Sequence, residues 1–419
     1  MQKLRIAVLG TVGADPFAGM AWMHLQLDAG LLRLGHDVRY VETTSAWPYD
    51  AAQGTRVDDA TYTLAYLARI TNRFGMGERW AYRRSWDDGA WLGPASADAA
   101  AWLATTDFVF NVSGATRIQQ DGFACGRLVH FGTDPVTEEL RYAAGDARTL
   151  EHIGAHDLTV TYGENLGTPR SPLPPLPRLA ARLRQPVLMD LWEAPPPSRD
   201  VFTTVGNWRQ DGKDEVFQGR PLRWSKHHEF LKFIDVPRLS GQTVELATNL
   251  DNPDRDTQLK AELKSQGAAS DEQDPHQIRG AASLDRDHRR RLQDGGWLIA
   301  DGPALSMDPF IYRDHILASR AEFTVAREFN VLPRTAWFSE RSACYLGAGR
   351  PVVTQDTGFS DVLPIGEGLF AFNTAEEAVE AIRAINADYP RHARAAKAIA
   401  HDWFSSDVVL PKLLADIGA

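Results

Sequence analysis

One stretch decides the fold of this chain, residues 319–359, SRAEFTVAREFNVLPRTAWFSERSACYLGAGRPVVTQDTGF. It sets two acids, Glu322 and Glu340, on either side of a predicted helix start, and the small residues of that helix lead into a short apolar strand, 351–354. The N–H groups and the positive dipole end of a helix N-terminus favour a diphosphate. A carboxylate beside them can accept hydrogen bonds from sugar hydroxyls. The stretch therefore predicts a site for a nucleotide-activated sugar.

The N-terminal residues begin a second α/β unit. An apolar run at 6–9 predicts a strand, a helical pattern covers about 21–34, and residues 37–42 predict the next strand. The loop after the first strand contains Gly10 and Gly13, without the Gly-x-Gly-x-x-Gly spacing of a dinucleotide fingerprint. A tight turn and a loop that faces the acceptor explain these glycines equally well.

Two acids follow later strands of this first half. Strands are predicted at 108–112, 128–131 and 158–161, and Asp134 and Glu164 lie in the polar turns after the last two. Because the carboxyl ends of parallel strands line the ligand crevice, both acids are expected at one wall of a cleft. Either one could position or deprotonate an acceptor hydroxyl. The alternative for Asp134 is a turn-forming role before Pro135.

A proline-rich break separates the two halves. Nine of the 24 prolines fall between 167 and 198, which predicts an extended connection between domains. We expect an N-terminal domain over 1–185, a C-terminal domain over 186–400, and a last helix, 401–419, that crosses back to the first domain. The polar stretch 249–292 predicts an insertion or a loop.

Composition limits the compartment and the partners. The net charge of -10 argues against a general polyanion-binding surface, and two distant cysteines exclude a disulfide framework. We expect no dedicated metal site and no cofactor, because no metal-ligand spacing of cysteines is present and no Asp-x-Asp stands at a strand end of the cleft. The N-terminus predicts a strand rather than a signal peptide, and no apolar run is long enough to span a bilayer. A cytoplasmic protein is expected, and a homodimer is left open.

The whole pattern resembles the GT-B glycosyltransferases, enzymes with two Rossmann-like domains that face each other across a cleft. Residues 319–323 and 349–353 resemble the signature of the retaining group 1 branch, which has two acids and ends in Gly-x-Pro-Val-Val. Seventeen residues separate the two acids here, against about seven in that branch. Residues 337–346 resemble the CgeB-like glycosyltransferases more closely.

The resemblance implies roles for particular residues. Glu340 would bind the ribose of the donor, and Glu322 would contact the sugar or the reacting face. The alternatives are a helix-start acid for Glu340 and a salt bridge to Arg320 or Arg327 for Glu322. Arg or Lys would neutralise the leaving phosphate. Asp134, Glu164 and Glu322 are the catalytic candidates, and the donor-binding candidates are Glu340, Arg320, Lys226, Arg209, Trp337, Phe338 and Ser339.

The function implied is transfer of a sugar from a nucleotide sugar, a UDP-sugar above others, to a hydroxyl of a small molecule, a glycan or a modified nucleic acid, with retention and without a metal. Three alternatives stay open on the same scaffold: a sugar-nucleotide epimerase, a DNA-base glycosyltransferase and a non-catalytic nucleotide-sugar binding protein. Incubation with a UDP-sugar and no acceptor would separate the epimerase from the transferase. A DNA-modifying enzyme needs a basic groove beside the cleft.

Overall fold

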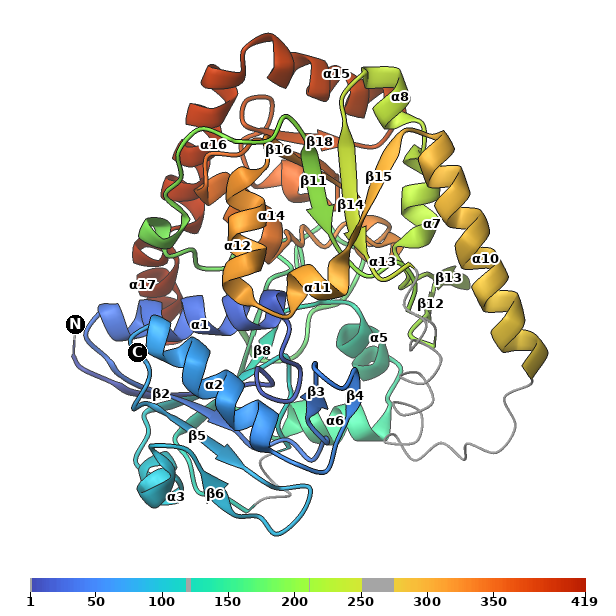
Figure 1. Ribbon diagram of the computed structural model, residues 1–419. Coiled ribbons are helices and arrows are strands. Elements are labelled where there is room, and N and C mark those ends of the chain that lie inside the picture. The colour runs from blue at the N-terminus through green and yellow to red at the C-terminus, as the bar shows by residue number, and fades with distance from the viewer. Residues whose placement is uncertain (1, 118–121, 211, 251–274) are drawn as a thin grey trace.

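The computed structural model describes residues 2–117, 122–210, 212–250 and 275–419. It contains two large sheets, one from each half of the chain, with helices packed against them (Figure 1). In Figure 1 the sheet of the second half lies above that of the first half. No strand is shared between them within the described ranges.

The first sheet has eight strands in the order β10-β9-β8-β7-β1-β2-β5-β6, and every pair is parallel except β5 with β6. Its central strands are apolar on both faces, as expected for a parallel sheet covered by helices. The eight strands are β1 (Arg5–Leu9), β2 (Asp37–Glu42), β5 (Trp80–Arg83), β6 (Trp91–Leu92), β7 (Phe108–Val112), β8 (Arg127–Gly132), β9 (Leu158–Thr161) and β10 (Leu179–Arg182).

The second sheet has six strands, all parallel, in the order β15-β14-β11-β16-β17-β18. The order reverses direction at β11, and such a switch point places a crevice at the carboxyl ends of the neighbouring strands. The six strands are β11 (Phe202–Val205), β14 (Val244–Thr248), β15 (Trp297–Asp301), β16 (Ala321–Thr324), β17 (Val352–Gln355) and β18 (Leu369–Phe372).

Two small hairpins accompany the sheets, β3 (Tyr49–Asp50) with β4 (Thr55–Arg56) and β12 (Glu215–Phe217) with β13 (Arg220–Leu222). The helices of the first half are α1 (Ala18–Arg33), α2 (Thr61–Arg73), α3 (Ala99–Leu103), α5 (Thr137–Ala143) and α6 (Ala147–Gly154). Those of the second half are α7 (His227–Phe230), α8 (Val236–Ser240), α10 (Pro275–Asp294), α11 (Gly302–Ser306), α12 (Pro309–Ala318), α13 (Glu328–Val331), α14 (Glu340–Gly347), α15 (Ala375–Ala387), α16 (Tyr389–Phe404) and α17 (Ser406–Asp416).

The last helix returns to the first half. α17 packs against α1 and β10, next to the N-terminal half of the molecule in Figure 1. Gly30 of α1 lies where a Cβ would come within 2.5 Å of Leu410 on α17, so the absent side chain permits the close approach. Val187 of the connecting segment also bonds to the start of this helix: its N–H donates to the Phe404 carbonyl over 2.7 Å, and its carbonyl accepts from Ser406 N over 3.0 Å.

Two expectations from the sequence are wrong in part. The proline-rich segment is more than a connection between domains, because β10 lies inside it and adds an edge strand to the first sheet. The polar stretch 249–292 is not all loop, because α10 begins at Pro275 and its C-terminal turns bury Leu292 against the second sheet. Residues 251–274 of that stretch lie outside the described residues. None of the described helices is long and apolar enough to cross a membrane.

Candidate functional site

A pocket lies at the carboxyl edge of the second sheet. It is formed where β16 and β17 end and where α14 begins, which is the position expected for a ligand crevice in a parallel α/β sheet. The lining residues are Lys226, Thr324, Val325, Ala326, Trp337, Phe338, Ser339, Arg341, Thr354, Gln355, Thr357 and Phe359. Four of the predicted donor-binding residues, Lys226 and Trp337 to Ser339, are among them.

Arg341 is the charged centre of the pocket wall. Its Nε donates to Glu322 Oε1 over 2.5 Å, Nη1 donates to the Val205 carbonyl over 2.6 Å, and Nη2 donates to Thr324 Oγ1 over 2.9 Å. The negative charge of Glu322 outweighs burial and raises the pKa of the guanidinium, which therefore stays charged. The structure thus fixes a cation at the pocket by bonds to two neighbouring strands.

Glu322 lies in the middle of β16, fully buried, with Oε1 on Arg341 and no hydrogen-bond partner for Oε2 among the described residues. It does not line the pocket. The salt bridge foreseen as the alternative for this acid therefore exists, but its partner is Arg341 rather than Arg320 or Arg327. In this arrangement the carboxylate holds the arginine in place.

Lys226, just before α7, brings a second cation to the pocket. Burial, followed by the charges of Arg341 and Arg327, lowers its pKa well below the usual range, while Glu322 and Asp134 act weakly in the opposite direction. The two acids are already occupied, Glu322 by Arg341 and Asp134 by Arg327. The carbonyl of Lys226 accepts from the N–H groups of Glu229 and Phe230, but its side chain has no hydrogen bond or ion pair among the described residues.

The N-terminus of α14 adds unpaired N–H groups. Ser339 is its N-cap residue, and its side chain makes no capping hydrogen bond. The first-turn amides of an uncapped helix are free to bind an anion. Before it, the Trp337 indole donates to the Thr133 carbonyl over 2.9 Å, which ties the pocket to the first half of the chain.

Glu340, the first residue of α14, turns toward the first half. Its Oε1 accepts from Cys344 Sγ over 2.9 Å and lies 3.5 Å from Gln26 Nε2 on α1. The residue keeps partial solvent exposure, yet surrounding protein raises the pKa of its carboxyl to about 7. Glu340 is thus adjacent in sequence to two lining residues of the pocket without lining it.

The remaining acidic candidates and arginines lie in separate places. Asp134, at the end of β8, bonds to Arg327 across the junction of the halves, and Arg327 stacks on Trp224 with 3.9 Å to the ring centroid. Glu164 pairs with Arg184 over 2.6 Å. Arg209 approaches Asp285 of α10 at 3.2 Å.

Arg320 precedes β16, at the opposite end of that strand from the pocket. It contacts Asp200 at 3.3 Å, donates to Asn386, and lies over the ring of Tyr389. One strand length therefore separates it from the donor-binding candidates. The arginine near the pocket end of β16 is Arg341.

The glycine loop after β1 packs inward. A Cβ on Gly10 would meet His24 at 2.4 Å, and a Cβ on Gly13 would meet Thr63 at 2.6 Å. The Gly13 N–H donates to Glu42 Oε2 over 2.7 Å. Close packing thus accounts for both glycines, and the structure shows no open space beside either.

Several residues of the pocket were not singled out from the sequence: Thr324, Arg341, Thr354, Gln355, Thr357 and Phe359. All but Arg341 lie at or just after the ends of β16 and β17. The strand-end argument that selected Asp134 and Glu164 in the first half would have found them. For Arg341 the only signal was its position one residue after Glu340, at the start of the predicted helix.

Comparisons with known proteins give the fold. No protein-family model matches the chain, and no curated protein matches its sequence. Solved structures do match over nearly the whole length. The Anabaena protein Alr3699/HepE in complex with UDP-glucose superposes with a TM-score of 0.55 at 13% identity, over 99% of each chain. A glycosyltransferase from Rickettsia africae gives 0.51 at 10% identity, over 99% of this chain and 98% of that one.

An alpha-glucosyltransferase in complex with UDP and a 13-mer DNA gives a TM-score of 0.52 at 11% identity, over 100% of both chains. These structural neighbours are glycosyltransferases, some with UDP or UDP-glucose bound. At such identities the likeness establishes the architecture. The chain has the GT-B fold, with two Rossmann-like domains that face each other across a cleft, and the fold predicted from the sequence is confirmed.

Proposed function

We propose that the protein is a glycosyltransferase that binds a nucleotide sugar, a UDP-sugar above others, in the pocket of the second half and transfers the sugar to a hydroxyl group. The observation that carries this proposal is a basic side chain at the pocket without an acid of its own. Arg341 is paired with Glu322 and Arg327 with Asp134, whereas no ion pair of Lys226 is found among the described residues. Glu340, the acid in the first turn of α14, turns toward the first half.

A diphosphate has the charge and the oxygens that this arrangement lacks. Its oxygens would accept from the first-turn amides of α14 and from Lys226 Nζ, and the added negative charge would raise the lysine pKa toward its ordinary value. When the sugar–phosphate bond breaks, Lys226 and Arg341 would neutralise the charge that develops on the leaving phosphate. In this proposal protein cations, and not a metal ion, carry that role.

The acids take different roles. Glu322 is proposed as a positioning residue for Arg341, and Glu340 keeps its proposed role on the ribose, which its partial exposure next to Ser339 and Arg341 supports. Asp134 is the proposed acid on the acceptor side. It lies just after β8 and directly after Thr133, whose carbonyl accepts a hydrogen bond from the indole of the pocket residue Trp337. Retention at the sugar carbon rests on the resemblance of residues 319–353 to retaining enzymes.

The first experiment measures donor binding. Thermal unfolding of the whole protein is followed with UDP-, GDP- and ADP-sugars, since a ligand at a hundred times its Kd stabilises by about 2.7 kcal/mol. We expect stabilisation by a UDP-sugar and by UDP, and loss of that stabilisation in Lys226→Met. Lys232→Met is the matched control, because Lys232 is an exposed lysine nearby on η3 (Leu231–Phe233) that pairs with Glu229.

The second experiment separates the reactions. The bound UDP-sugar is incubated without acceptor and then with pooled hydroxyl acceptors, and the products are identified by NMR and mass spectrometry. Sugar transferred to an acceptor with release of UDP supports the proposal. A changed sugar still attached to UDP would identify an epimerase. If no nucleotide sugar binds, the proposed function is wrong.

A further inference from the structure

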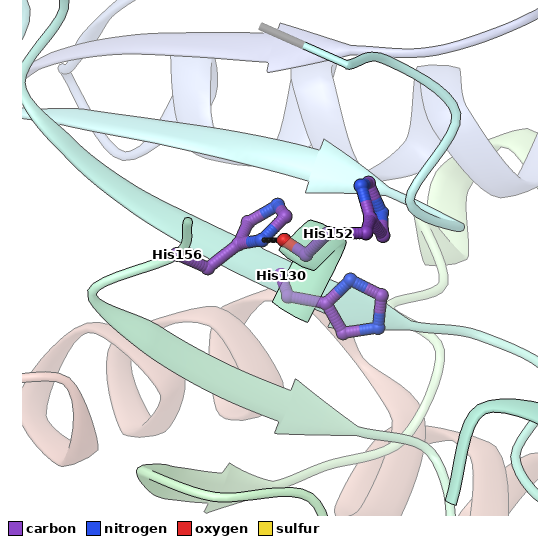
Figure 2. Close-up of side chains that lie close together, drawn as sticks. All are labelled: His130, His152 and His156. Carbon is purple, nitrogen blue, oxygen red and sulfur yellow. Dashed lines mark hydrogen bonds between the residues drawn. The ribbon is translucent and has the colours of Figure 1, made fainter. Parts of the chain in front are cut away.

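We propose that His130, His152 and His156 bind a transition-metal ion of the zinc type within the first half of the chain, separate from the pocket of the second half. His130 lies on β8, His152 on α6, and His156 in the turn after α6. One ring nitrogen from each lies within 4.8 Å of the others. Figure 2 shows the three rings gathered beside the ends of the neighbouring strands.

The cluster is buried and its nitrogens are under-used. His130 is 0%, His152 6% and His156 1% exposed. Both nitrogens of His130 and both of His152 lack a hydrogen bond among the described residues, although His130 Nε2 makes an ion-pair contact with Glu138. A buried polar atom without a partner costs about 1–3 kcal/mol, so four such atoms in one place need a reason. A metal ion bound by one nitrogen of each ring would satisfy two of them at once.

The partners of the rings fix which nitrogens face inward. His130 Nε2 lies 2.8 Å from Glu138 Oε2, and His156 Nδ1 lies 2.8 Å from the His152 carbonyl. With a proton on each of these nitrogens, the lone pair is left on His130 Nδ1 and His156 Nε2. Metal-bound histidines usually donate their other N–H to a carboxylate or a backbone carbonyl in this way.

One existing hydrogen bond would be exchanged. His156 Nε2 accepts from Asn111 Nδ2 over 3.0 Å, and coordination of a metal would replace that bond. Asn111 would keep its other two bonds, to the carbonyl and to the N–H of Thr116, at 2.8 and 3.0 Å. The cost is therefore one hydrogen bond, against two or more new ligand bonds.

Gly114 lies beside the cluster. A Cβ on this glycine would be 2.8 Å from His152 Nε2, 3.1 Å from His130 Cε1 and 3.2 Å from Glu138 Oε1, so the missing side chain lets the backbone pass close to the rings. The three histidines are the protein ligands, a set that zinc accepts together with a further oxygen ligand. Glu138 holds the far nitrogen of His130.

The location indicates what the ion would do. All three histidines are buried, so the site is closed to substrate, as structural zinc sites are. The ion would join α6 and the turn after it to β8, the strand that leads into the segment with Asp134. The alternative is a metal-free cluster in which the rings only pack edge to face, with centroids 5.0–5.9 Å apart.

The test uses the full chain with any affinity tag removed, because a histidine tag would bind the same metals. The protein is stripped with a chelator and titrated with Zn²⁺ and with Co²⁺. We expect one ion per chain, a rise of several degrees in Tm, and a Co²⁺ spectrum of four-coordinate nitrogen and oxygen ligands. His152→Gln should abolish ion uptake, the rise in Tm and the Co²⁺ spectrum. His24→Gln should preserve these three properties, because His24 is equally buried but lies outside the cluster.

Two outcomes overturn the proposal: no ion bound by the parent protein, or the same uptake by His152→Gln and His156→Gln. Should both variants fail to fold, X-ray absorption at the zinc edge of the loaded parent protein decides, since three imidazole ligands support the site and one or none refutes it. The result is independent of the proposed glycosyl transfer, because nucleotide-sugar binding is measured at other residues.

Discussion

The two Rossmann-like domains use the same edge of their sheets for opposite chemistry. In the second domain the strand ends and the start of α14 gather cations, and Lys226 is left without an acid among the described residues. In the first domain the strand ends carry acids, and Asp134 and Glu164 are each paired with an arginine. The comparison teaches that topology provides the crevice, whereas the charge left unpaired in it selects the ligand.

The largest effect, on the free energy of unfolding, is expected for the buried Glu322–Arg341 pair of the second domain. Arg341→Met leaves the Glu322 carboxylate inside β16 without a partner, and an uncompensated buried charge costs about 3–5 kcal/mol. Denaturant unfolding measures the loss. The double variant with Glu322→Gln should recover most of it. A single variant as stable as the parent protein would show that Glu322 is not held as the structure indicates.

The second-largest effect, on donor affinity, is expected for Lys226. Lys226→Met should weaken UDP-sugar binding by about 1.5–3 kcal/mol, the size of a hydrogen bond to a charged group, which is roughly tenfold to a hundredfold in Kd. Stability should not fall, because a half-buried charge is removed. Calorimetric titration of Lys226→Met and Lys232→Met gives the contrast. Equal affinities in the two variants would remove Lys226 from the donor site.

Glu340 joins the two domains and predicts a pH effect. Its folded pKa of about 7 lies above the ordinary 4.5, so the folded protein keeps a proton that the unfolded chain releases. Stability from this group is therefore lost as pH rises from about 4.5 to 7. Glu340→Gln should be more stable than the parent protein at pH 8, by on the order of 1 kcal/mol given partial exposure, and equal to it at pH 4.

The same variant tests the ribose role. Glu340→Gln should weaken donor binding by about 1–3 kcal/mol if the carboxylate accepts from ribose hydroxyls. Parallel stability curves for the variant and the parent protein from pH 4 to 8 would contradict the pH prediction. Unchanged affinity for every nucleotide sugar would limit Glu340 to its contacts with Cys344 and Gln26.

The smallest effect on stability is expected in the first domain. Asp134→Asn breaks a partly exposed pair with Arg327 and should change the free energy of unfolding by about 1 kcal/mol or less. If Asp134 acts on the acceptor, turnover should fall while donor affinity is kept. Asp190→Asn, which breaks the exposed pair with Arg33, is the control. A fall in donor affinity without a fall in turnover would exclude the acceptor role.

The sequence was sufficient for the fold because alternation of strands and helices is a local signal. It failed at β10, a strand that lies between Pro177 and Pro186, and at α10, whose many charges made an amphipathic helix that buries Leu292 look like a loop. For the pocket, Lys226 and residues 337–339 could be predicted because strand ends and helix starts can be read from the chain.

Pairing between side chains could not be predicted in the same way. The sequence offered Arg320 or Arg327 as the partner of Glu322, but in the structure Arg320 pairs with Asp200 and Arg341 of α14 pairs with Glu322. In the histidine cluster, His152 and His156 are near each other in sequence, but His130 lies on β8, so only the packing of β8 and α6 brings all three together. Contacts that depend on how elements pack are thus visible only in three dimensions.

The hydrogen bonds between Val187 and the start of α17 have a mechanical consequence. The chain passes between the domains twice, once before β11 and once between α16 and α17, and these two passages are bonded side by side. Two connections bonded side by side define a single hinge axis between the domains. A change in the angle between the two sheets that turns about that axis keeps those two bonds, whereas sliding or twisting of one domain past the other would break them.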